Sequence, residues 1–121
     1  MIPKFRAWDK IRNRISEVER IYIDTKGVRL RDENGEYWRR FDDAILMQST
    51  GVFDKNGKEI FEGDVVNIFG EKLSKIYYSD GAFCVDILIG GTPLHAFLSE
   101  QLEIIGNIHR NPELMEEVLN D

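Results

Sequence analysis

The sequence predicts a mainly β protein: a basic hairpin region, a small barrel or sandwich of short strands, and a short C-terminal α-helix. Two observations predict this class. Apolar and polar residues alternate over many short segments, and turn signals containing glycine separate these segments. The 121 residues, 42% of them hydrophobic, suffice for one compact unit, with a β-rich N-terminal region over residues 1–50 and the barrel region over residues 51–121.

The N-terminal region is expected to hold a short opening strand and a β-hairpin. Residues 5–8 alternate, whereas residues 15–24 alternate only toward their end, so the start of this second element stays open between strand and helical turn. Residues 28–31 alternate, and Asn34-Gly35, a strong hairpin signal, then leads into residues 37–41. We therefore expect strand, turn and strand here.

The C-terminal region is expected to consist of short strands joined by tight turns. Asn56-Gly57 marks a turn before Ile60-Phe61, which are expected to dock into the core, and Gly63-Asp64 marks a second corner. Strands are expected over residues 44–50, 65–69, 75–78, 82–89, 94–98 and 102–108.

A helix is expected at the end of the sequence. Asn111 can cap its N-terminus, Pro112 suits the first helical position, and Glu113 complements the helix dipole. Apolar residues four positions apart then share one side of the helix, which we expect to pack against the barrel. These pairs are Leu114 with Val118 and Met115 with Leu119.

Charge is distributed unevenly along the sequence. The net charge is −6, but residues 1–40 carry eleven Lys or Arg and seven Asp or Glu, a net charge of +4. Residues 41–121 carry five and fifteen, a net charge of −10. A solvated surface explains most charge blocks of this kind. The alternative is complementarity between the two parts, within one chain or head to tail between copies, which would produce a homo-oligomer.

Arginine and aromatic side chains gather on the expected hairpin and form the candidate binding surface. Surfaces that stack nucleic-acid bases use such residues, but so does a half-buried sheet with a charged outer face, and the negative net charge favours the sheet. Nucleic acid is therefore the alternative partner. The candidate residues are Arg29, Arg31, Tyr37, Trp38, Arg39 and Arg40.

The sequence contains no catalytic signature: no phosphate-binding loop, nucleophile elbow, metalloprotease helix or paired CxxC. His95 and His109 fall on different expected elements, which does not predict a metal site. We expect no cofactor, no metal and no enzymatic activity; a metal-dependent hydrolase or nuclease using acidic turns is the third hypothesis. Turn chemistry explains those acidic residues without a ligand. They are Asp54, Glu59, Glu62 and Asp64.

Cysteine content and hydropathy predict the compartment. The single cysteine, Cys84, lies in an apolar run, so we expect a small buried side chain and no internal disulfide. Residues 1–9 lack the apolar run of a signal peptide, and no segment approaches the ~18 apolar residues of a membrane span. We therefore expect a cytoplasmic protein with no membrane partner.

Four blocks in order along the chain resemble the YopX-like proteins. They are residues 4–9 (KFRAWD), 46–51 (LMQSTG), 54–66 (DKNGKEIFEGDVV) and 104–114 (IIGNIHRNPEL). His109-Arg110 departs mildly from the pattern, where an aromatic and an acidic residue are more usual. The resemblance implies a mainly β fold with an SH3-like barrel in the C-terminal part and a phage or prophage origin. It implies no activity.

Together these features predict a non-enzymatic phage or prophage accessory protein that acts as a protein-interaction module. Its partner is expected to be a host or phage protein in the cytoplasm of a bacterial cell. The alternative is an accessory protein that binds nucleic acid through the basic N-terminal hairpin.

Overall fold

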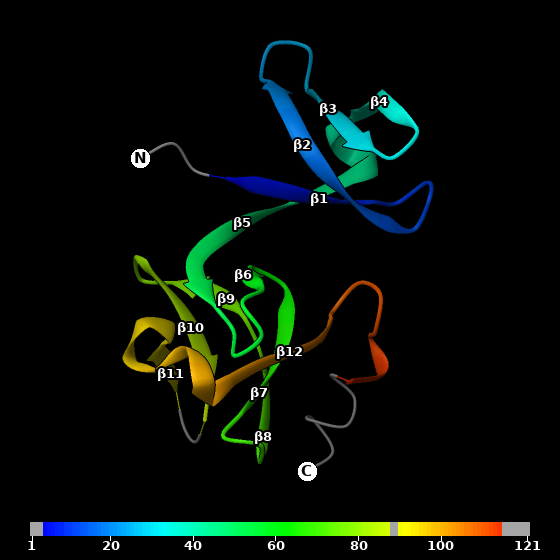
Figure 1. The fold of residues 1–121 in the computed structure, drawn as a ribbon. Coiled ribbons are helices and arrows are strands. Elements are labelled where there is room, and N and C mark those ends of the chain that lie inside the picture. Colours follow the sequence, from blue (N-terminus) through cyan, green and yellow to red (C-terminus); the bar gives the residue numbers. More distant parts are fainter. Residues whose placement is uncertain (1–3, 88–89, 115–121) are drawn as a thin grey trace. The chain divides into compact units, whose positions relative to one another are not determined.

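The computed structural model describes residues 4–87 and 90–114 and divides the chain into two compact units, Met1–Gln48 and Ser49–Asp121. The protein is mainly β, as predicted, and its strands form three antiparallel sheets (Figure 1). Each unit has a hydrophobic core of its own. In the part of the chain that the structure describes, no helix is long and apolar enough to cross a membrane.

The first unit is built on one antiparallel sheet with the strand order β4-β3-β2-β1-β5. Residues 44–48 of β5 pair with β1, and β5 then continues into the second unit. A 3-10 helix, η1 (Phe41–Asp43), connects β4 to β5. The strands are β1 (Phe5–Asp9), β2 (Arg14–Tyr22), β3 (Gly27–Asp32), β4 (Gly35–Arg40) and β5 (Ala44–Phe53).

The predicted hairpin is β3 and β4, and its alternation sets the two faces of the sheet. Val28 and Leu30 are fully buried, whereas Arg29 and Arg31 between and beside them are exposed. The ambiguous element over residues 15–24 is a strand from its beginning. The core of this unit consists of Ala7, Val28, Leu30 and Ala44, with Val18, Ile21, Tyr37, Phe41 and Leu46 packed against them.

The second unit contains two three-stranded sheets, ordered β12-β7-β8 and β11-β10-β9, and a short strand, β6, that pairs with the second half of β5. The strands are β6 (Glu59–Phe61), β7 (Asp64–Ile68), β8 (Lys72–Lys75), β9 (Tyr77–Ser79), β10 (Ala82–Asp86), β11 (Gly91–Pro93) and β12 (Leu102–Asn107). Their core is Ile60, Val66, Ile68, Ile76, Val85, Leu94 and Leu102.

The expected barrel is not closed, because the described strands of the second unit divide into separate sheets. The break lies at Ile76, inside the strand predicted over residues 75–78. Its N–H donates to the carbonyl of Asp64 at 2.8 Å, and its carbonyl accepts from the N–H of Gly63 at 2.9 Å. Because Ile76 bonds back to the start of β7, β8 ends before it and β9 begins after it in the other sheet.

Two other expectations differ from the structure. Residues 94–98 were expected to be a strand, but Leu94–Ala96 form a 3-10 helix, η2, closed by the N–H of Phe97 on the carbonyl of Leu94 at 3.1 Å. At the C-terminus, Glu113 and Leu114 are helical, and the remainder of the expected helix, residues 115–121, lies outside the described residues. The described part holds no helix of seven residues.

Candidate interaction surface

The six candidate residues of the hairpin lie on opposite faces of the sheet. Trp38 and Arg40 of β4 are exposed beside Arg29 and Arg31 of β3, since Trp38 pairs with Arg29 across the strands. Tyr37 and Arg39 point to the other face, toward the core side. We call the exposed side the outer face and define it by its side chains. They are Tyr22, Arg29, Arg31, Trp38 and Arg40.

Trp38 is held in place on the outer face while keeping 41% of its surface exposed. Its ring lies 5.4 Å from the ring of Tyr22, at an interplanar angle of 49°. It also lies over Gly27, where a Cβ atom would be only 2.0 Å from Cζ2 of Trp38. Glycine is thus needed at position 27 for the approach of the ring. Trp38 is an exposed aromatic side chain that is already ordered.

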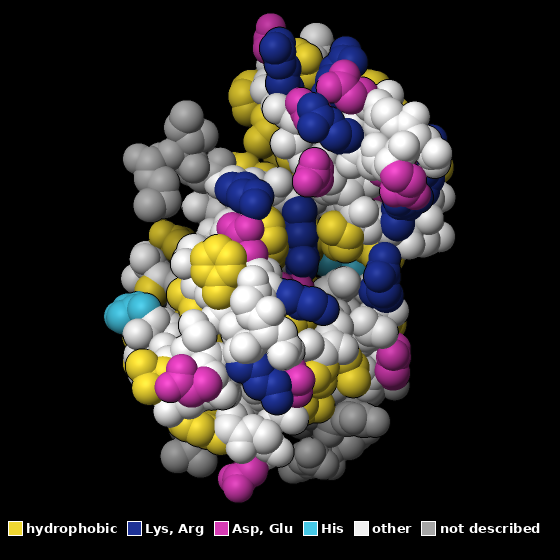
Figure 2. Space-filling model, in the orientation of Figure 1, with side chains coloured by type: hydrophobic (Ala, Val, Ile, Leu, Met, Phe, Trp, Pro, Cys, Tyr) yellow, Lys and Arg dark blue, Asp and Glu magenta, His cyan; other side chains and the backbone are white. Residues whose placement is uncertain are grey.

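Each arginine of the outer face has a carboxylate beside it. Arg29 lies 3.5 Å from Glu36, and Arg31 pairs with both Glu19 and Glu36, the latter at 3.7 Å. Arg40 pairs with Asp43 at 3.1 Å. Figure 2 shows basic and acidic side chains interspersed over this unit. These local ion pairs compensate the positive charge that the hairpin carries in the sequence.

On the opposite side, Arg39 and Tyr37 belong to a structural network around Asp9. The Arg39 Nε donates to Oδ1 of the fully buried Asp9 at 3.0 Å. Two guanidinium groups lie over the Tyr37 ring, that of Arg12 at 4.2 Å and that of Arg39 at 4.7 Å from the ring centroid. Its hydroxyl is 2.6 Å from Oγ of Ser16. These contacts fix the first unit internally and remove Tyr37 and Arg39 from the exposed surface.

The network changes the acidity of its members. Burial alone would raise the pKa of Asp9, but the bonds from Arg39 and from the N–H groups of Arg12 and Ile11 outweigh it and lower the pKa. Burial raises the pKa of Tyr37. Asp9 is therefore an anion at neutral pH, held by a cation and two backbone donors.

Asp54 and Asp64, two of the four acidic residues that a metal-dependent enzyme would use, accept hydrogen bonds from backbone N–H groups. Asp54 is buried and accepts three backbone N–H groups: Oδ1 from Asn56 and Lys58, each at 2.9 Å, and Oδ2 from Ile104 at 3.0 Å. Asp64 accepts the N–H of Phe61 at 2.8 Å. Among the described residues, no three His, Cys, Asp or Glu side chains come together in a group that could hold a metal ion.

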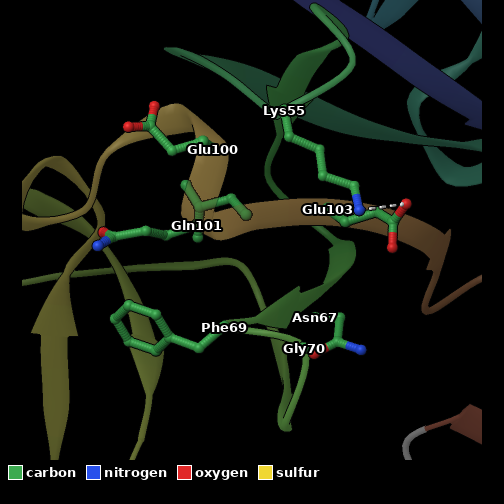
Figure 3. A pocket seen from close by; sticks show the side chains of 8 residues that line it. Lys55, Asn67, Phe69, Gly70, Glu100, Gln101 and Glu103 are labelled. Carbon is green, nitrogen blue, oxygen red and sulfur yellow. Dashed lines mark ion pairs between the residues drawn. The ribbon is translucent and has the colours of Figure 1, made fainter.

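The second unit has a small pocket of about 60 Å³ (Figure 3). Lys55 and Glu103 form an ion pair of 3.3 Å at its rim, and Oδ1 of Asn67 is buried without a hydrogen-bond partner. Phe69 is 56% exposed and has a positive φ of 58°. A further pocket of about 240 Å³ is mostly apolar. Its lining is Thr50, Val52, Gly81, Ala82, Phe83, Leu94 and His95.

The larger pocket is lined by both Thr50 and His95, but Oγ1 of Thr50 donates to the carbonyl of Ile60 at 2.7 Å. Sequence patterns did not indicate either pocket. Their residues come from segments that the fold brings together, such as Lys55 before β6 and Gln101 before β12. Tyr22 of the outer face was missed for a different reason. It belongs to β2, two strands away from Trp38, so only the strand pairing brings the two rings together.

Comparisons with known proteins agree with the order of blocks in the sequence. The model of the family described as YopX protein matches residues 4–116. The crystal structure of protein EF1440 from Enterococcus faecalis is similar at 31% identity and a TM-score of 0.69, covering 95% of this chain and 99% of that chain.

A second crystal structure, of protein yopX from Bacillus subtilis, has 20% identity and a TM-score of 0.64, covering 92% of this chain and 96% of that chain. At 20% sequence identity, this similarity shows a shared fold and nothing about function. A comparison with curated proteins gave no match.

Proposed function

The chain belongs to the YopX protein family, and from that premise we propose that it is a non-enzymatic protein-interaction module of a phage or prophage. Its binding surface is the outer face of β3 and β4. The observation that carries this proposal is the pre-ordered Trp38, which rests on Tyr22 and Gly27 and is surrounded by arginines.

Tryptophan, tyrosine and arginine are the residues that dominate the energetics of protein interfaces. An aromatic ring that is already fixed loses little conformational freedom on binding, so more of its contact energy contributes to affinity. The arginines contribute directional hydrogen bonds, and the neighbouring Glu19 and Glu36 restrict their positions. A partner with a mixed-charge surface around an apolar pocket suits this arrangement.

Binding of nucleic acid is the second candidate, because arginines next to an exposed tryptophan also suit stacked bases. The local carboxylates disfavour it, since each phosphate would have to replace an existing ion pair with Glu36, Glu19 or Asp43. The net charge of −6 adds long-range repulsion.

The two candidates are separated by capture from a bacterial lysate, with wild-type chain, Trp38→Ala and Tyr78→Ala as parallel baits. Tyr78 is a suitable control because it is an aromatic residue of the second unit with 56% exposure. We expect a protein that is recovered by the wild type and by Tyr78→Ala but depleted with Trp38→Ala. Equal recovery by all three baits would place binding outside the outer face.

Filter binding at low ionic strength tests the alternative. We expect no retention of DNA or RNA, because weak electrostatic binding would be strongest under these conditions. Retention that disappears with Trp38→Ala would instead favour the nucleic-acid function.

A further inference from the structure

Strand β4 ends the sheet of the first unit, and among the described strands only β3 pairs with it. The N–H of Phe41 donates to the carbonyl of Lys26 at 2.9 Å, in line with the β3–β4 register. Since bonding alternates along an antiparallel pair, the N–H groups of Glu36, Trp38 and Arg40 point away from β3. The open edge of β4 therefore presents backbone donors at every second residue.

The side chains leave this edge accessible. The ring of Trp38 leans over Gly27 of β3, away from the open edge. The outward carbonyl of Trp38 accepts one hydrogen bond, from Nη1 of Arg39 at 3.0 Å. A carbonyl oxygen has two lone pairs, so one remains for an incoming N–H group. An additional antiparallel strand can bind here without displacing the tryptophan.

The sequence of β4 is complementary to itself. We propose that two copies of this chain join through their β4 edges, antiparallel, with a two-fold axis at Trp38. In this register Trp38 faces Trp38 of the second copy, Glu36 faces Arg40, and Tyr37 faces Arg39. Directly opposed residues of opposite charge stabilise antiparallel pairs, and this register provides two such Glu–Arg pairs.

Other registers are worse. A shift of one residue would place the outer face of one copy on the core side of the other, because side chains alternate with period two. A shift of two residues toward the C-terminus would place Arg39 opposite Arg39 of the second copy, and like charges directly opposite are destabilising. A shift of two residues toward the N-terminus would place Glu36 opposite Trp38 and lose both Glu–Arg pairs, so the charges of β4 favour the register centred on Trp38.

This interface is isologous, unlike the head-to-tail association that the charge of the whole sequence suggests. It uses the edge of β4, whereas the proposed function uses the outer face, so each can hold without the other. Pairing would also place the two Trp38 residues about 5.5 Å apart at Cα and extend the outer face across both copies.

The test is sedimentation velocity over a concentration series for the full chain, Glu36→Arg, Arg40→Glu and an equimolar mixture of the two variants. We expect a concentration-dependent wild-type dimer and self-association weakened on the order of ten-fold in each variant, because like charges then face each other. The mixture should recover the dimer, since each Arg of one variant then faces a Glu of the other. Circular dichroism checks that both variants are folded.

Amide hydrogen exchange of the wild type gives a second measurement that needs no variant. The N–H groups of Glu36, Trp38 and Arg40 should become protected as concentration rises, while those of Tyr37 and Arg39 are protected throughout by β3. A wild type that stays monomeric, a mixture that associates no better than its components, or exchange at these three amides that is independent of concentration would each overturn the proposal.

Discussion

At the scale of single residues, contacts between distant positions decide which side chains are available for binding. Tyr37 and Trp38 are neighbours in sequence, yet the ring of Tyr37 contacts the guanidinium groups of Arg12 and Arg39, whereas the ring of Trp38 covers Gly27. The strand β4 was predicted from the sequence, but the contact of Asp9 with Arg39, thirty positions away, was not. The sequence thus indicated the hairpin that carries these side chains, but not which of them are held in internal contacts.

The close approach of Trp38 to Gly27 predicts the effect of Gly27→Ala. The added methyl group would displace the ring, lowering the free energy of unfolding by about 1–3 kcal/mol, as overpacking does in other proteins. Chemical denaturation measures this cost. In a Trp38→Ala background the same substitution should cost much less, because the clashing ring is gone; an equal cost in both backgrounds would contradict the role of the ring.

Asp9 predicts a pH dependence of stability. The pKa of Asp9 is lowered in the folded state. The ionised carboxylate therefore contributes fully to the free energy of unfolding above the pKa of the unfolded chain, about 3.9, and this contribution is lost as the pH falls through the pKa of the folded state. Asp9→Asn should lower the free energy of unfolding by about 3 kcal/mol at neutral pH, because Arg39 loses a buried partner. Below pH 4 the difference between the wild type and Asp9→Asn should shrink. A difference that stays constant with pH would contradict this.

At the scale of elements, periodicity predicted most strands but not where they change sheets. Residues 65–69 and 102–108 became β7 and β12 with small shifts of their ends. The strand expected over residues 75–78 is interrupted because Ile76 bonds to Gly63 and Asp64, a tertiary contact that alternation does not encode. Leu94 is buried within a 3-10 turn, and a single buried apolar residue fits either structure.

Asp54 lies outside the candidate surface, yet we expect its substitution to have a large effect on stability, because its side chain holds a turn. Asp54→Ala leaves three backbone N–H groups without their acceptor, and we expect the free energy of unfolding to fall by about 2–4 kcal/mol. Asp54→Asn keeps one oxygen and should lose less. Glu71→Ala, an exposed control, should change stability by less than about 0.5 kcal/mol. Denaturation in urea measures the free energy of unfolding of each variant. A loss for Asp54→Ala as small as that for Glu71→Ala would contradict the role assigned to Asp54.

At the scale of the whole molecule, the charge asymmetry follows the two units, but the arginines of the hairpin are paired with carboxylates. Residues 1–48 carry eleven basic and nine acidic residues, a net charge of +2, and residues 49–121 carry five and thirteen, a net charge of −8. Ion pairs within the first unit compensate the arginines of its hairpin. Composition revealed the asymmetry, but only the strand register shows which carboxylate lies beside which arginine.

The central claim, that the outer face binds a protein, is tested most directly by the dissociation constant of the purified complex. Calorimetric titration would compare wild type, Trp38→Ala and Tyr78→Ala with the partner recovered from the lysate. Trp38→Ala should weaken binding at least about ten-fold, as expected for a tryptophan at the centre of an interface, and Tyr78→Ala should leave it unchanged. An unchanged dissociation constant for Trp38→Ala would contradict the account.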